Sequence, residues 1–153
     1  MADFFGENAT LRDSNVPSEK IRSQDQHGRM RIAHDQITFT AELTTSDVLC
    51  LMKLPAGAKV YEAEINTDDL GTTGVFDIGW AASAEGGEVA DPNGLFPALD
   101  VKAAANARQK MVNSVPAFQK RFTEEVEIQV VPSESTDVAI GNDLKLTIWY
   151  VVD

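Results

Sequence analysis

The sequence predicts an all-β fold, an antiparallel β-sandwich of jelly-roll or Greek-key type, preceded by an extended N-terminal arm. At least six strand-like segments are separated by turn residues every 8–12 positions, which is typical of sandwiches and barrels. Several segments alternate apolar and polar residues, as half-buried antiparallel strands do. The last strand-like segment lies at the C-terminal end and should pair with an early strand, which favours a Greek key over a meander. An immunoglobulin-like topology is the alternative.

Charge and apolar residues are unevenly distributed over the 153 residues, a length suited to one domain with a sizeable core. The net charge is −11, but residues 1–35 hold five basic and six acidic residues, so residues 36–153 carry −10 of it. Apolar residues are sparse from residue 6 to 35 and follow no period. We therefore divide the chain into an N-terminal arm, residues 1–35, and a β-sandwich domain, residues 36–153.

The arm has two interpretations. It cannot bury enough apolar area to fold alone, so it is either a disordered terminus or a loop that crosses the body. Alternatively it becomes ordered against a neighbouring subunit, because scattered apolar side chains suit a surface groove. We favour the second. The expected contact residues combine apolar side chains with arginines: Leu11, Arg12, Val16, Ile21, Arg22, Arg29 and Arg31.

The first three strands are expected at residues 36–43, 48–54 and 58–66. The first alternates strictly between apolar and polar residues, and the second is almost continuously apolar. Pro55 ends the second strand because it cannot donate to a ladder, and Gly57 accepts a positive φ in the turn. The third strand alternates again, with one face formed by Lys59, Tyr61, Ala63 and Ile65.

The second half of the chain contains three more expected strands and an insertion. A strand over residues 75–81 has one apolar face, formed by Phe76, Ile78 and Trp80. A long irregular stretch begins at residue 85. Residues 95–111 then contain a short helix or continue the irregular insertion, because their alanine-rich part has good helix propensity. Clean alternation predicts the last two strands over residues 123–131 and 144–152.

Few residues offer chemistry. The single cysteine, Cys50, excludes an internal disulfide, and its apolar surroundings in the sequence predict a small buried side chain. Two histidines, His27 and His34, are too few for a structural zinc site. The sequence contains no P-loop, no G-x-G-x-x-G and no G-x-S-x-G motif. We therefore expect no catalytic residues, no metal and no cofactor.

Carboxylates are plentiful but have ordinary explanations. Glu62 with Glu64, and Glu125 with Glu127, share strand faces as a glycosidase pair would, although solvated strand faces are far commoner. Turn residues supply oxygen ligands suited to calcium but match no EF-hand spacing, so acidic turns explain them better. Whether an ion binds there stays open. These turn residues are Asp68, Asp69, Asp91 and Asn93.

The charge also limits the partners. A net charge of −11 argues against nucleic acid and against an anionic membrane surface, because both require basic residues. The first residues lack the basic start and apolar stretch of a signal peptide, and no apolar run approaches a membrane span. We therefore expect synthesis in the cytoplasm and a protein partner.

Two segments carry a family resemblance. Residues 46–60 have the sequence SDVLCLMKLPAGAKV, and residues 68–80 follow with DDLG and then FDIGW. Together with residues 90–96 and 99–101, this order resembles small structural proteins of tailed bacteriophages, in particular capsid decoration (cement) proteins. The resemblance covers residues 40–101 and, more loosely, the C-terminal strand.

The resemblance implies a function without an active site. Such proteins are β-rich, often jelly-roll, modules that bind the major capsid protein on the outside of the head and stabilise contacts between its subunits. They often form trimers, and their N-terminal arms commonly reach the capsid or a sister subunit. The expected location is thus the capsid exterior of the virion, after synthesis in the host cytoplasm. Alternatives are a tail or fibre-linked phage module and, less favoured, a carbohydrate-binding or hydrolytic β-domain.

Overall fold

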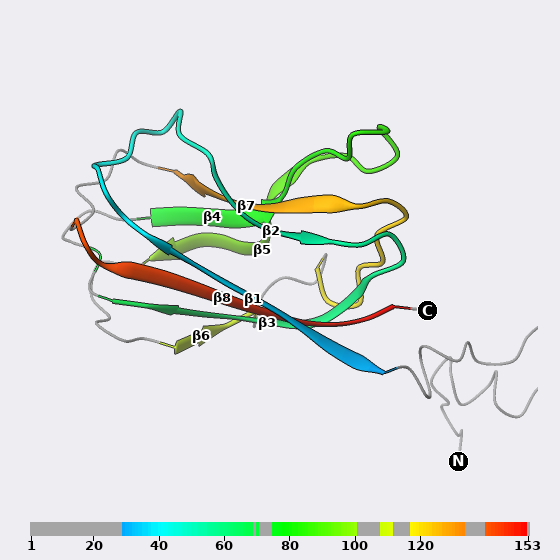
Figure 1. Cartoon of the computed structure of the whole chain (residues 1–153). Helices are drawn as coiled ribbons and strands as arrows, with labels where there is room; N and C mark the ends of the chain where they lie inside the picture. Colours follow the sequence, from blue (N-terminus) through cyan, green and yellow to red (C-terminus); the bar gives the residue numbers. More distant parts are fainter. Residues whose placement is uncertain are drawn as a thin grey trace, which may run out of the picture.

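The computed structural model describes residues 29–68, 70, 75–100, 108–111, 117–133 and 140–152. This part of the chain contains eight β-strands and no helix (Figure 1). Accordingly, no helix of the described residues is long and apolar enough to cross a membrane. The strands are β1 (Met30–Thr38), β2 (Leu49–Leu54), β3 (Lys59–Thr67), β4 (Val75–Trp80), β5 (Asp91–Asp100), β6 (Arg108–Lys110), β7 (Val126–Pro132) and β8 (Asp143–Val151).

The strands form two four-stranded sheets that face each other as a sandwich (Figure 1). The sheet orders are β1-β8-β3-β6 and β2-β7-β4-β5, and every pairing is antiparallel. Strands pair first with last: β1 with β8, β2 with β7, β3 with β6 and β4 with β5. This nested pairing is one long hairpin wound over itself, which is the jelly roll. The predicted fold class is therefore confirmed.

Alternation along the late strands builds the core between the sheets. Val126, Ile128 and Val130 of β7 face inward and are almost completely buried. From the opposite sheet, β8 contributes three inward side chains with no exposed surface, namely Leu144, Leu146 and Ile148. As expected, this C-terminal strand pairs with an early strand; it lies between β1 and β3.

Strand β3 departs from the predicted alternation. A bulge between Val60 and Glu62 interrupts its pairing with β8. Val60 and Ala63 are therefore both buried although they are three positions apart in the sequence, and Tyr61 lies at the bulge, where the register with β8 skips it. The expectation that Lys59 and Tyr61 share a face with Ala63 was wrong, because a bulge reverses the side of every residue that precedes it.

One strand start and one helix candidate also differ from the prediction. Strand β1 begins at Met30, six residues before the predicted strand start, and Met30 pairs with Val151 of β8. The helix candidate at residues 95–111 was wrong in its described parts, because residues 95–100 belong to β5 and residues 108–110 form β6. Pairing with neighbouring strands overrides local helix propensity here.

Cys50 was also predicted wrongly. It lies on β2 and is exposed rather than buried, because the neighbouring core side chain of its strand is Leu49. Partial burial and the nearby Glu127 carboxylate both raise the pKa of the Cys50 thiol. Its thiol therefore stays protonated at neutral pH and is a weak nucleophile.

Two glycines are required by the backbone. Gly57 has a φ of 82° in the β2–β3 turn, as its sequence context predicted. Gly79 lies on β4, where an added Cβ would overlap the Asp91 carbonyl oxygen of the paired strand β5. Only glycine therefore permits β4 and β5 to approach this closely.

Candidate assembly surface

The two ends of the sandwich differ in what they expose. At the end that we name the arm end, β1 begins and β8 ends. Backbone pairing places the 55–58 turn and the 81–90 and 117–125 segments at this end (Figure 1). The opposite end, which we name the turn end, carries residues 39–48 and 140–142.

Large apolar side chains are exposed mainly at the arm end. Among the described residues, six large hydrophobic side chains are exposed. Two lie apart from each other at the turn end, Val48 and Ile140. The other four lie at the arm end and have exposed fractions of 62% for Met30, 63% for Ile32, 82% for Val89 and 55% for Phe118. Exposed apolar side chains that gather on one region are typical of protein interaction sites.

The first group of apolar side chains lies on the outer face of the β1-β8-β3-β6 sheet. Ala33 and Ile37 of β1 pack on the core, so the alternating Met30 and Ile32 point outward. Ile32 is paired in register with Trp149 of β8, which is half-buried. Cross-strand partners on one face lie in contact distance. Met30, Ile32 and Trp149 therefore form one apolar surface, which we name the β1 patch.

The same outer face becomes ionic toward β6. Glu62 Oε1 lies 2.5 Å from Lys110 Nζ, and Glu64 Oε1 lies 2.5 Å from Arg108 Nε. Each carboxylate of this strand pair is thus engaged by a cation of β6. The two ion pairs attach a strand of only three residues to β3, which is a structural role for both glutamates.

A buried carboxylate connects two segments of the arm end. The Glu88 side chain is only 6% exposed, and its carboxylate accepts hydrogen bonds from the Thr123 backbone N–H at 2.6 Å and from the Thr123 hydroxyl at 2.8 Å. Lys120 Nζ lies 2.8 Å from the other oxygen. Burial raises the pKa of Glu88, but the bonds from Lys120 and Thr123 outweigh it, so its pKa lies below the usual value. Glu88 is therefore ionised at neutral pH.

Further hydrogen bonds fix the 81–90 segment in place. The Ser83 hydroxyl donates to Glu124 and accepts from the Glu88 N–H at 3.0 Å. The Gly87 N–H also donates to Glu124, at 3.0 Å. Because its backbone and side-chain bonds join it to residues 120–124, this loop behaves as part of the body.

Lys120 is itself held on aromatic rings. Its ammonium group lies 5.8 Å from the ring centroid of Trp80 and 5.5 Å from that of Phe122. These two rings pack edge to face with centroids 5.2 Å apart. The cation is therefore shared between the Glu88 carboxylate and two π faces, a partly desolvated setting that favours a single position.

A groove of about 420 Å³ adjoins this network. Its lining consists of Ala56, Ser83, Ala84, Glu85, Thr123, Glu124 and Glu125. Three of these residues are glutamates, none is a lysine or arginine, and one glutamate, Glu125, lies 3.0 Å from Lys53. The groove is consequently acidic.

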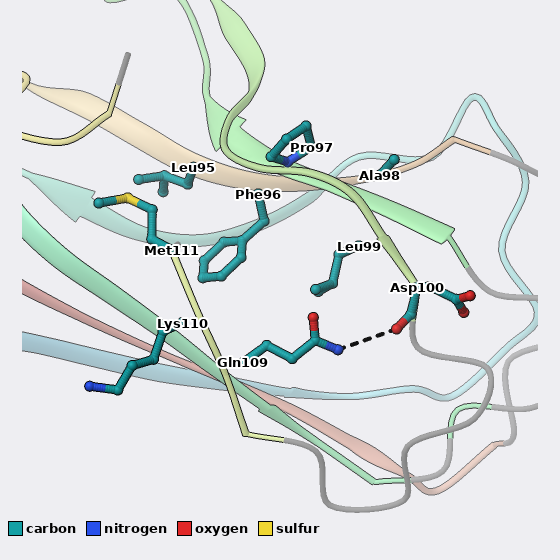
Figure 2. A pocket seen from close by; sticks show the side chains of 9 residues that line it. All are labelled: Leu95, Phe96, Pro97, Ala98, Leu99, Asp100, Gln109, Lys110 and Met111. Atoms are coloured by element: carbon teal, nitrogen blue, oxygen red, sulfur yellow. Dashed lines mark hydrogen bonds between the residues drawn. The ribbon is translucent and has the colours of Figure 1, made fainter. Parts of the chain in front are cut away.

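A second hollow, of about 220 Å³, lies between β5 and β6 at the open edge of the sandwich (Figure 2). Figure 2 shows Phe96 and Leu99 from one side and Gln109 and Met111 from the other. Gln109 donates to the Asp100 carbonyl oxygen at 3.3 Å, and Lys110 is engaged by Glu62. Its polar groups are used in structural contacts, so this hollow is an open sheet edge rather than a candidate catalytic cleft.

Most of the predicted contact residues lie outside the described part of the chain. Arg29 and Arg31 are described, and both are exposed at the arm end. The remaining five of the seven, Leu11, Arg12, Val16, Ile21 and Arg22, fall in residues 1–28, outside the described residues. Their predicted role stays a prediction.

The other candidates from the sequence are engaged or scattered. No group of three or more histidine, cysteine or acidic side chains among the described residues is arranged to hold a metal ion. Asp68 accepts a bond from the Asp143 N–H at 3.0 Å, and His34 bonds the Thr147 hydroxyl at 3.0 Å. Asp69 and His27 lie outside the described residues.

Sequence reasoning missed the Glu88–Lys120 pair and the exposed Val89 and Phe118. The run Glu85-Gly86-Gly87-Glu88 is typical of an exposed loop, and nothing local marks one of its glutamates as buried. The one available signal was the apolar residue Val89 directly after this loop. Its neighbours do not alternate between apolar and polar, so no strand pattern predicts its burial.

Comparison with solved structures places this fold among chains from bacteriophage capsids. A chain of the capsid of Ralstonia phage GP4 matches with a TM-score of 0.69 and 25% identity, over 94% of this chain and 92% of that chain. A chain of the cyanophage Pam1 capsid asymmetric unit matches with a TM-score of 0.66 and 20% identity, over 82% and 86%. A chain of the acid-stable capsid of Helicobacter pylori bacteriophage KHP30 gives 0.51 and 14%, over 82% and 90%.

No protein-family model and no curated protein matches the sequence. The likeness is therefore one of fold, and it extends over almost the whole length of each matched chain.

Proposed function

We propose that this protein is a structural component of a bacteriophage virion that binds the outside of the capsid and stabilises contacts between major capsid subunits. One observation carries the proposal: the jelly roll is shared, nearly end to end, with chains from the capsids of three phages. Function does not follow from fold alone, so the surface must support it too. Exposed apolar side chains gathered at the arm end do so.

We also propose that the protein associates with itself, as a trimer, through the β1 patch and the residues of the arm that precede β1. Met30 and Ile32 lie on an edge strand, where unpaired backbone groups and exposed apolar side chains favour pairing with another chain. Their exposed fractions, 62% and 63%, leave apolar area that a subunit contact would cover. Arg29 precedes Met30, Arg31 lies between Met30 and Ile32, and both arginines are exposed, so two of the predicted contact residues adjoin this patch in the sequence.

The capsid role is tested with phage heads that lack this protein. Such expanded heads should rupture at lower temperature or lower salt than complete heads, and added full-length protein should restore their resistance. Equal resistance of heads with and without the protein would exclude the stabilising role. Copy number per virion separates the alternatives, because decoration proteins occur in hundreds and tail or fibre-linked modules in far fewer.

Self-association is tested separately, by light scattering on the purified full-length chain. Ile32→Asp should reduce the mass of the assembly toward that of a single chain, because a carboxylate cannot be buried unpaired in an apolar contact. Ile140→Asp is the matched control, since Ile140 is equally exposed but lies at the turn end. A wild-type chain that stays monomeric at high concentration would contradict the trimer.

A further inference from the structure

The arm end holds a braced platform, formed by residues 81–90 and 117–125, that is separate from the β1 patch. Its second segment runs beside β3: the Gln119 N–H donates to the Val60 carbonyl at 2.7 Å, and the Val60 N–H donates to the Lys120 carbonyl at 2.9 Å. Ala117 and Phe122 in the same segment have no exposed surface. The backbone there is fixed from both sides.

Phe118 is exposed on this fixed backbone. It follows the buried Ala117 directly, and its own side chain remains 55% exposed. Backbone bonds of the adjacent residues Ala117, Gln119 and Lys120 hold the chain on both sides of Phe118. Ordering such a side chain on binding costs little entropy.

Val89, in the 81–90 segment, is likewise an exposed side chain on an anchored backbone. Its carbonyl oxygen accepts a bond from Trp80 Nε1 at 3.1 Å, and the preceding Glu88 is buried against Lys120 and Thr123. The Val89 side chain is nevertheless 82% exposed. Val89 thus directly follows Glu88, and Phe118 lies two residues before Lys120, so both exposed side chains are attached to backbone that one ion pair connects.

The adjoining acidic groove indicates the partner's charge. Its three glutamates include Glu124, whose carboxylate braces Ser83 and Gly87, and Glu85, which lies at the loop tip. The platform contains two cations: Lys120, which is paired with Glu88, and the exposed Arg121, which does not line the groove. A second copy of this chain carries a net charge of −11 and would be repelled from such a surface. A partner with basic groups would be attracted.

We propose that the braced platform docks a basic, apolar-bearing surface of the major capsid protein, with Val89 and Phe118 as its apolar anchors and the acidic groove receiving a lysine or arginine side chain. This inference rests on the proposed capsid role and names the surface that performs it. It assigns capsid contact to the platform and leaves self-association to the β1 patch.

The test measures binding of full-length variants to purified heads that lack the protein, by co-sedimentation over a range of concentrations. Val89→Asp with Phe118→Asp should weaken apparent affinity tenfold or more, because central apolar anchors dominate interface energy. Val89→Ala with Phe118→Ala should weaken it less. Glu85→Lys should weaken it several-fold, with a smaller dependence on salt than wild type shows. Unchanged thermal unfolding and unchanged assembly mass establish that each variant is folded.

The matched control is Val48→Asp with Ile140→Asp, which places the same charges on exposed apolar residues at the turn end. It should bind as wild type does. Folded platform variants that bind heads as tightly as wild type would overturn the platform while leaving the capsid role intact. A wild-type chain that does not sediment with heads would overturn the proposed function, and the platform with it.

Discussion

The arm end and the turn end of the sandwich are closed by different means. At the turn end, backbone bonds between Phe39 and residues 141–142 close the body, and Phe39 stacks on Phe76 with ring centroids 6.1 Å apart. At the arm end, the buried Glu88–Lys120 pair and the edge-to-face rings of Trp80 and Phe122 do so. Internal anchoring is thus similar at both ends, whereas exposed apolar surface is concentrated at the arm end.

The largest expected effects test whether both ends are anchored equally. Phe122→Ala at the arm end and Phe39→Ala at the turn end should each lower the free energy of unfolding by about 3–5 kcal/mol, because each removes a buried ring and leaves a cavity. Chemical denaturation followed by tryptophan fluorescence and circular dichroism measures both. A loss of less than about 1 kcal/mol of unfolding free energy in Phe39→Ala would contradict equal anchoring, because the turn end would then be only loosely closed.

A smaller effect should separate the two ends. Glu88→Gln should cost about 2 kcal/mol, because it leaves the Lys120 ammonium, whose side chain is 30% exposed, without its counter-ion. At the turn end, Asp143→Asn removes the charge of the carboxylate that accepts from the Thr38 hydroxyl at 2.6 Å and should cost about 1 kcal/mol or less, since the contact is exposed. Denaturant midpoints measure both, and equal costs would remove the distinction between the ends.

The smallest effect is the dependence of stability on pH that Glu88 contributes at the arm end. The pKa of Glu88 lies below its usual value, so its ionised form stabilises the fold above the unfolded-state pKa, about 4.3. That contribution is lost as pH falls through the lower, folded-state pKa. The difference in Tm between wild type and Glu88→Gln should therefore be constant from pH 7 to pH 5 and shrink below about pH 4. A difference that stays constant down to pH 2 would contradict the assignment.

Period-2 alternation predicted most of the fold and missed its irregular parts for physical reasons. The strands around Ile128 and Leu146 follow alternation closely, because each is central in its sheet and faces a continuous core. The bulge at Tyr61 has no sequence period, since it results from pairing with β8. Residues 95–100 form a strand although a short helix or an irregular insertion was expected, because Leu95 and Leu99 bury their side chains through bulged pairing with β4.

The assembly surface was less predictable than the fold. Arg29 and Arg31 were expected at a contact from composition alone, and both are exposed at the arm end. The platform could not be foreseen, because Glu88 and Lys120 are 32 positions apart and meet only through the folded sheets. Sequence patterns report local burial, whereas an interaction surface is assembled from segments that are distant along the chain.

The nested pairing of strands has a consequence for when the assembly surface comes into existence. Met30 pairs with Val151, and β8 separates β1 from β3 within their sheet. Until that strand has left the ribosome, the β1-β8-β3-β6 sheet lacks its central member, and such long-range closures fold slowly. The β1 patch, which needs Trp149 of β8 beside Ile32, is therefore completed only after β8 has paired with β1. An association that requires the whole patch consequently waits for this long-range pairing.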